Sequence, residues 1–349
     1  MPPKISTPSS AARSTAPLSG EFALIARYFA PLAAGFPGAD GLRDDVAVIA
    51  PAAGCELVLK SDAIVAGVDF PPEEAADLVA RKALRVNLSD LAAKGAVPRA
   101  YLLDLILPET IGDDWIALFA AGLAQDQREY GVHLIGGDMS STPGPVTIAV
   151  MAMGEAPAGR IVRRGGAKAG DQVFVSGTLG DAALGLGVLQ GRLPAPDEAA
   201  AAFLLDRYRL PQPRVALGPR LIGLASATID VSDGLVADLR HICEAAGLAA
   251  TVEAPALPLS MAARAMIAAD PGLLSAPLGG GDDYEILFTA PPQAAAAIAA
   301  LSHALGLPIT AIGRMMRPAA AGPRVTVVDG ARRPIELGSE GWTHFGRSG

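Results

Sequence analysis

The chain has 349 residues, of which 51% are hydrophobic, with a formal net charge of −8 and a pI of about 5.1. This length allows two domains, while an acidic balance without a basic stripe excludes nucleic acid and anionic membranes as expected partners. No segment reaches the roughly 20 consecutive apolar residues of a membrane span. The cysteines Cys55 and Cys243 form no CxxC motif, so we expect a reduced, cytoplasmic protein.

Residues 1–18 are rich in Pro, Ser, Thr and Ala and lack the apolar core of a signal peptide, which predicts a disordered tail. An amphipathic helix is expected from about residue 19 to 32. Residues 71–96 predict a long helix, with prolines and acids at its start and a glycine near its end. A second helix is expected over 113–131, with strands at 46–50, 56–60, 63–68, 101–108, 132–137 and 145–154.

Residues 155–171 are rich in Gly and Arg, and we place the domain boundary within them, giving domains over 19–158 and 159–349. Beyond the boundary, strands and helices alternate more regularly. Strands are expected at 172–177, 227–230, 249–254, 284–290, 308–313 and 324–329. Helices are expected from 181, near 214–224, from 233, near 260–269 and over 292–305. The predicted fold class is α/β (α+β).

Acidic residues mark the ends of many predicted elements: "RDD" (43–45), "KSD" (60–62), "NLSD" (87–90), "IGGD" (135–138), "DVSDG" (230–234) and "GGGDDYE" (279–285). Any one of them is explained equally by helix capping or a tight turn. Carboxylates that converge on one place, however, repel one another unless a hard divalent cation lies between them. The set therefore indicates a site for Mg²⁺ together with phosphates.

Other nucleotide chemistries lack their motifs here. The sequence has no GxxxxGK[ST] phosphate loop and no HRD or DFG motif, and its glycines at 175–187 do not fit GxGxxG. The histidines at 133, 241, 303 and 344 do not have the spacing of a zinc site.

The ordered set "NLSDLAAKGA", "LIGGD", "GAKAGD", "DVSDGL" and "GGDDYEILF" resembles the thiamine-monophosphate kinase family, which is related to aminoimidazole ribonucleotide synthetase. The resemblance runs over almost the whole chain except the tail. It implies a two-domain fold in which the N-terminal domains of two subunits form a barrel across a homodimer interface. It also implies transfer of a phosphoryl group from ATP to thiamine monophosphate, assisted by several Mg²⁺ ions. Because phosphoryl transfer requires mainly positioning and charge neutralisation, we expect direct in-line transfer without a phosphoenzyme.

The resemblance also assigns roles to residues. The positions that match magnesium ligands are Asp45, Ser61, Asp62, Asp90, Asp138, Asp230 and Asp233. Those that match ATP contacts are Gly137, Asp138, Arg164 and Ser232. Those that match contacts to the thiamine phosphate are Asp69, Asp282 and Trp342.

The chain departs from the family pattern at Arg43 (family Gly), Lys60 (Thr or Ser), Asp69 (His) and Asp282 (Glu). The magnesium positions are kept, whereas two of the three acceptor-binding positions are altered. Two alternatives therefore stay open beside the kinase: a related ATP-dependent enzyme with another acceptor, and a non-catalytic nucleotide-binding dimer. For Asp69, we expect a contact with the cationic thiazolium or with an additional Mg²⁺ rather than with the acceptor's phosphate, which an ionised carboxylate repels.

Overall fold

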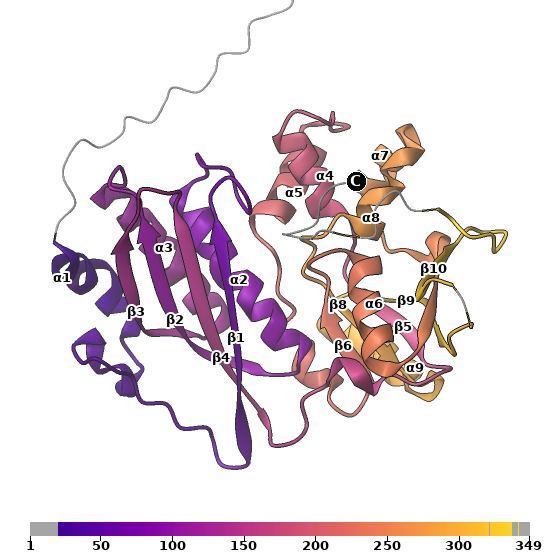
Figure 1. Cartoon of the computed structure of the whole chain (residues 1–349), viewed down its shortest axis with the longest axis horizontal. Helices are drawn as coiled ribbons and strands as arrows, with labels where there is room; N and C mark the ends of the chain where they lie inside the picture. Colours follow the sequence, from indigo (N-terminus) through magenta and orange to yellow (C-terminus); the bar gives the residue numbers. More distant parts are fainter. Residues whose placement is uncertain (1–19, 321, 337–340, 342–349) are drawn as a thin grey trace, which may run out of the picture.

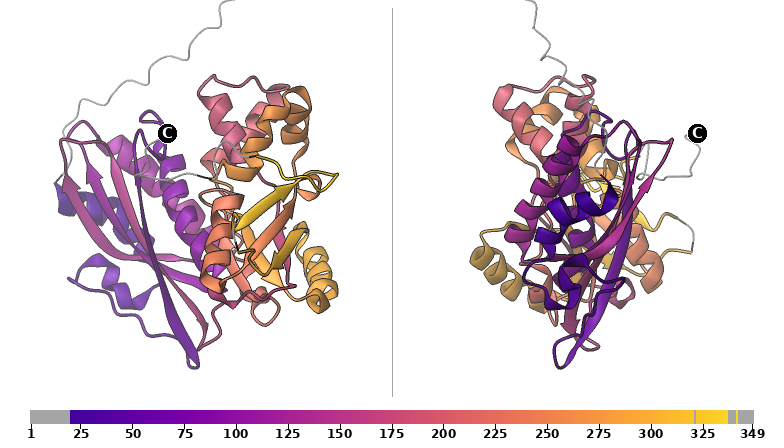
Figure 2. Two further views of the ribbon diagram at one scale, coloured as in Figure 1. Left: turned by 45° about the vertical axis from the view of Figure 1, so that its right-hand side comes forward. Right: turned by 90° about the vertical axis from the view of Figure 1, so that its left-hand side faces the viewer.

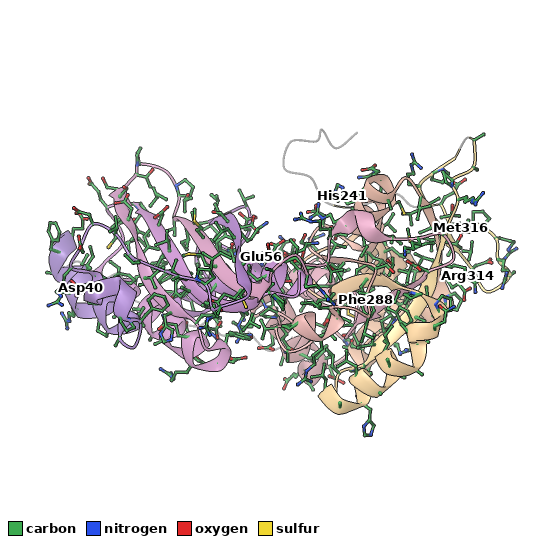
Figure 3. The ribbon with its side chains drawn as sticks, turned by 90° about the horizontal axis from the view of Figure 1, so that it is seen from below. Asp40, Glu56, His241, Phe288, Arg314 and Met316 are labelled. Carbon is green, nitrogen blue, oxygen red and sulfur yellow. The ribbon has the colours of Figure 1, made fainter. Side chains whose placement is uncertain are left out.

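Two β-sheets organise the chain, one in each half, as the computed structural model shows (Figure 1). The structure describes residues 20–320, 322–336 and 341. The predictions for the tail at 1–18 and for Trp342 lie outside these residues. Helix α2 (Ala76–Ala93) lies between the N-terminal sheet and the C-terminal half, in Figure 1 and in the left view of Figure 2. In Figure 3, Asp40 marks one end of the molecule and Arg314 and Met316 the other.

The N-terminal sheet has the strand order β1-β4-β2-β3, with β2 and β3 parallel and the other pairs antiparallel. Its strands are β1 (Cys55–Val65), β2 (Val97–Leu107), β3 (His133–Ser141) and β4 (Thr147–Pro157). Helices α2 and α3 (Asp113–Tyr130) pack on one face, where Leu84, Tyr101 and Phe119 are fully buried. Because side chains alternate along a strand, every second residue of these strands points to this core.

The opposite face of this sheet is only partly covered, by residues 21–42. This segment starts with α1 (Glu21–Leu24), continues as a single π-helical turn and ends in short 3₁₀ turns. On this open face Leu59 is 61% exposed and Met151 41% exposed. Exposed apolar side chains on an uncovered sheet face are typical of a protein–protein interface.

The C-terminal sheet has six strands in the order β10-β7-β9-β5-β8-β6, all antiparallel except the β10–β7 pair. Its strands are β5 (Gln172–Ser176), β6 (Ala227–Asp230), β7 (Ala249–Glu253), β8 (Ile286–Ala290), β9 (Ile309–Met316) and β10 (Val325–Val328). Its helices are α4 (Asp181–Leu189), α5 (Glu198–Arg209), α6 (Leu235–Ala246), α7 (Met261–Ala269), α8 (Ser275–Gly279) and α9 (Ala295–Leu305). In the core of this half, the rings of Phe174 and Phe288 stack with their centroids 5.2 Å apart.

Two predictions about single elements are corrected, and one helix lies where none is predicted. Residues 46–50 form no strand, and Val46 and Val48 are 65% and 70% exposed, because no strand among the residues that the structure describes pairs with them. Residues 214–224 hold only a 3₁₀ turn, Gly218–Leu221, next to prolines that cannot donate backbone hydrogen bonds. Helix α5 was not predicted, although Asp197 caps it by accepting the N–H of Ala200.

Candidate functional site

A group of carboxylates lies where the two halves meet. Asp62 comes from β1, Asp90 from α2 and Asp230 from the end of β6. Lys60 joins the first two, because its Nζ atom lies 3.1 Å from Oδ1 of Asp62 and 3.0 Å from Oδ2 of Asp90. Asp233 lies close enough to Asp62 for its charge to raise the pKa of that carboxyl. We call Asp62, Asp90, Asp230 and Asp233 the junction cluster.

Burial and neighbouring carboxylates make two members of the junction cluster, Asp62 and Asp230, hold protons more tightly than exposed acids do. Asp230 is 3% exposed and accepts a hydrogen bond from the Ser89 hydroxyl at 2.8 Å. Burial, and after it the charge of Asp90, raise the pKa of Asp230 to about 7. Burial also raises the pKa of Asp62, against the opposing charge of Lys60. A bound cation would relieve this repulsion.

The turn that follows β6 is held by one buried carboxylate. Oδ2 of Asp238 accepts the backbone N–H groups of Ser232, Asp233 and Gly234, each at 3.1 Å. Burial, together with Asp230 and Asp233, outweighs these three donors and raises the pKa of Asp238 to about 8. Asp238 therefore fixes the backbone that carries the candidate residues Ser232 and Asp233.

The residues present fit a hard divalent cation in their chemistry. Carboxylate oxygens are the ligands that Mg²⁺ prefers, and the junction cluster supplies them from four positions. Within the described ranges, no three His, Cys, Asp or Glu side chains stand close enough to hold a metal ion as they are. The ammonium group of Lys60 instead lies between two of the carboxylates.

A second acidic group lines a cavity of about 690 Å³ beside β3. Its walls include Asp44, Asp45, Asp104 and Asp138. Asp138 follows Gly137, whose φ is +147°. A Cβ atom at Gly137 would lie 1.8 Å from the carbonyl oxygen of Leu103, so only glycine fits there.

Strand pairing places these two acidic groups on opposite faces of the sheet. Asp62 pairs across β4 and β2 with Gly137, whereas Asp138 pairs with Asp104 in the adjacent row. Because side chains alternate, Asp62 points to the helix-covered face, and Ser61 and Asp138 point to the open face. Three strand spacings of about 4.8 Å also separate β1 from β3, a total of about 14 Å. One chain therefore brings together only part of the predicted magnesium set.

The predicted acceptor residues Asp69 and Asp282 lie close together at the junction. Lys82, 3% exposed, donates to the carbonyl oxygen of Asp69 at 3.1 Å and lies 3.3 Å from Oδ2 of Asp282. The Tyr208 hydroxyl donates to the same carbonyl at 3.2 Å. Oδ2 of Asp69 itself accepts the N–H of Val65 at 2.8 Å, which closes its own turn. Asp282 has φ +61°, a conformation that non-glycine residues adopt rarely.

The candidate ATP contact Arg164 is exposed and lies near Lys94, at the C-terminal end of α2. Burial and, to a smaller degree, the charge of Arg164 lower the pKa of Lys94 to about 8. Lys94 donates to the carbonyl oxygen of Thr228 in β6. Two cations thus border the junction cluster where an anionic cosubstrate would approach.

Sequence reasoning missed Lys82, Lys94, Asp104 and Asp238 as site residues and treated Lys60 only as a departure from the family pattern. A signal was present for Lys82, since it interrupts the apolar face of a helix and is therefore buried. Asp238 offered none, because an acid in the first turn of a helix is common at the surface.

Comparison with known proteins agrees with this architecture. Residues 43–156 match the model of the AIR synthase related protein, N-terminal domain, and residues 168–323 that of the C-terminal domain. The thiamine-monophosphate kinase of Caulobacter vibrioides is 43% identical over 301 residues, which cover 85% of this chain and 84% of that protein. The chain belongs to the thiamine-monophosphate kinase family.

Solved structures of the family have the same fold. The crystal structure of thiamine-monophosphate kinase from Stenotrophomonas maltophilia K279a superposes with a TM-score of 0.75 at 42% identity, covering 82% of this chain and 89% of that one. A structure of AaThiL complexed with AMPPCP and TMP gives a TM-score of 0.73 at 31% identity, covering 85% and 89%. The expected two-domain fold is thereby confirmed. In the described part of the chain, no helix has the length and apolar character needed to cross a membrane.

Proposed function

We propose that this chain transfers the terminal phosphoryl group of ATP to thiamine monophosphate, giving thiamine diphosphate and ADP. The observation that carries the proposal is the junction cluster, built by both halves of a member of this kinase family. ATP and a phosphate monoester bring several negative charges, which an acidic site holds only together with cations.

The transfer breaks the bond between the γ-phosphorus of ATP and the bridging oxygen that stays with ADP. It forms a bond between that phosphorus and a phosphate oxygen of thiamine monophosphate. The attacking phosphate, with a second pKa near 6, is largely deprotonated at neutral pH, so no general base is required. We infer direct in-line transfer without a phosphoenzyme.

The residues divide the work of positioning and neutralising charge. Bound Mg²⁺ would be held by the junction cluster together with Asp45, Ser61 and Asp138, and would neutralise the phosphates. Gly137, Arg164 and Ser232 would contact ATP, and the planar guanidinium of Arg164 suits phosphate oxygens. Asp69, Asp282 and Trp342 would bind the acceptor, with Lys82 fixing the first two.

We also infer a homodimer. The exposed Leu59 and Met151 lie on the open face of the N-terminal sheet, and a second copy packed there would close the sheets into a barrel. A partner would also explain why Asp138 and Asp62 of one chain lie on opposite faces, if each site uses Asp62 of one subunit and Asp138 of the other. The domain limits 19–158 and 159–349 and a cytoplasmic location stay predictions.

The proposal is tested by incubating the purified protein with ATP, Mg²⁺ and thiamine monophosphate and measuring thiamine diphosphate. Formation of thiamine diphosphate and ADP in equal amounts supports it. ATP hydrolysis without thiamine diphosphate would favour a related enzyme with a different acceptor, which the altered residues Asp69 and Asp282 keep open. ATP binding without turnover of any phosphate acceptor would favour a nucleotide-binding dimer.

A further inference from the structure

Lys60 is a charged residue at a junction position where the family pattern has a neutral one. It stands where the family pattern has Thr or Ser, in the middle of β1, where its backbone pairs with Ala152 of β4. Its side chain points to the helix-covered face, in the same direction as Asp62. Its Nζ atom lies within 3.1 Å of carboxylate oxygens of Asp62 and Asp90, a contact that an ammonium ion makes.

The ammonium group bridges two candidate metal ligands. Its contacts of 3.1 Å to Asp62 and 3.0 Å to Asp90 leave one oxygen of each carboxylate engaged by the same cation. The side chains are only partly exposed, 31% for Lys60, 42% for Asp62 and 20% for Asp90, so water screens the pair incompletely. A divalent ion at the same point would meet a like charge at contact distance.

We propose that Lys60 takes the place of one divalent cation in this enzyme, bridging Asp62 and Asp90 in the loaded state as it does in the free chain. The inference rests on the proposed function and deepens it, because it assigns part of the charge neutralisation to the chain itself. A lysine on a paired strand is already tethered beside the carboxylates, whereas Mg²⁺ must give up tightly held water to bind there.

A consequence is that the number of divalent ions depends on residue 60. With a neutral residue at this position, Asp62 and Asp90 lose their shared cation and become free to bind another ion. With Arg, a positive charge stays and the number of ions does not change.

The test counts Mn²⁺ bound per chain in the presence of the ATP analogue AMPPCP, by electron paramagnetic resonance of free Mn²⁺. We expect Lys60→Ser to bind one more Mn²⁺ per chain at saturation than the wild type, and Lys60→Arg to bind the same number as the wild type. Lys168→Ser, which removes an exposed lysine of the other half, is the matched control and should leave the number unchanged.

Equal Mn²⁺ numbers in the wild type and Lys60→Ser would overturn the inference, as would an additional ion in Lys60→Arg. If Lys60→Ser does not fold, Lys60→Met decides instead, because it keeps most of the apolar stem and loses only the charge. The count does not depend on the acceptor. A wild type that makes no thiamine diphosphate would refute the proposed function, while an unchanged Mn²⁺ number in an active enzyme would refute only the role of Lys60.

Discussion

The Nζ atom of Lys82 lies 3.3 Å from Oδ2 of Asp282, although 200 positions separate the two residues in the chain. Lys82 belongs to the N-terminal half, and Asp282 to the loop before β8 in the C-terminal half. The same ammonium lies 3.9 Å from the ring centre of Tyr208 in α5. The buried ammonium group of Lys82 therefore contacts both candidate acceptor residues, Asp69 and Asp282. It also connects the two halves of the chain.

Replacing Lys82 with Met should weaken the fold and the acceptor site together. Met keeps the stem against Tyr208 but leaves Asp282 without its cation. We expect a loss of about 1–3 kcal/mol of stability, measured by urea unfolding, since Asp282 keeps contact with water. We also expect roughly a tenfold rise in KM for thiamine monophosphate, against less than about twofold for ATP. An unchanged KM for thiamine monophosphate would show that Lys82 does not position this site.

Replacing Asp90 with Ala should abolish turnover while the protein stays folded. The negative charge of Asp90 raises the pKa of both Lys60 and Asp230. Its loss also removes a candidate magnesium ligand. We expect kcat to fall by roughly a hundredfold or more, with a circular dichroism spectrum like that of the wild type. Asp329→Asn, which changes a partly exposed acid directly after β10 in the other half, serves as the control. Near-normal activity of Asp90→Ala would contradict the cluster.

Mixing two inactive variants should restore activity if sites are shared between subunits. Asp62→Asn and Asp138→Asn are each expected to be inactive as pure dimers. In a mixed dimer, one of the two sites would contain both wild-type acids, which gives about a quarter of wild-type activity after complete subunit exchange. Activity is assayed after partial denaturation and refolding of the mixture.

Light scattering should accompany this experiment. A stable, active monomer at micromolar concentration would contradict the dimer itself. Introducing Leu59→Asp on the open face of both variants should prevent restoration, because a buried unpaired charge disfavours the interface. Met261→Asp, at an 88% exposed position in the C-terminal half, is the matched control and should not.

Without metal, the protein should be more stable at mildly acidic pH than at pH 8. The pKa of Asp230 rises from 3.8 to about 7 on folding, so between about pH 4 and 7 the folded state keeps a proton that the unfolded state has released. Stability therefore decreases as pH rises through this window, by on the order of 2–4 kcal/mol. Urea midpoints measured with EDTA at pH 5 to 8 check this. Asp230→Asn should make the profile shallower, while Asp238, whose pKa is also raised, keeps part of the slope. A wild-type profile that rises with pH would contradict it.

Replacing Asp69 with His should change KM for thiamine monophosphate more than KM for ATP. One hydrogen bond of about 1 kcal/mol limits the change to roughly tenfold or less. Because the Asp69 carboxylate closes its own turn through Val65, some loss of stability is also expected. A wild type inactive toward thiamine monophosphate at saturating Mg²⁺, with activity gained in Asp69→His, would contradict the proposed acceptor. So would a substitution that shifts only the ATP parameters.

Much of the fold could be predicted from local patterns. The apolar spacing and capping signals of α2 and α3 and the apolar runs of β2, β4, β5 and β8 gave elements close to the observed ones. The predictions were wrong where a pairing strand or a proline determines the secondary structure, at residues 46–50 and 214–224. The valines at 46 and 48 alternate as in a strand, but no strand in the described part of the chain pairs with them.

The sequence by itself determined which residue types are available for chemistry: a repeated set of aspartates in family order and the substitutions at 60, 69 and 282. Only the tertiary structure decided which of them meet. Asp62, Asp90 and Asp230 converge because β1, α2 and β6 pack at one junction, whereas Asp138 is turned to the opposite face by the two-residue period of its sheet. The bridging of Lys60 and the burial of Lys82 could not be foreseen, since a lysine's charge is accommodated inside a protein only by carboxylates and carbonyls that distant segments bring to it.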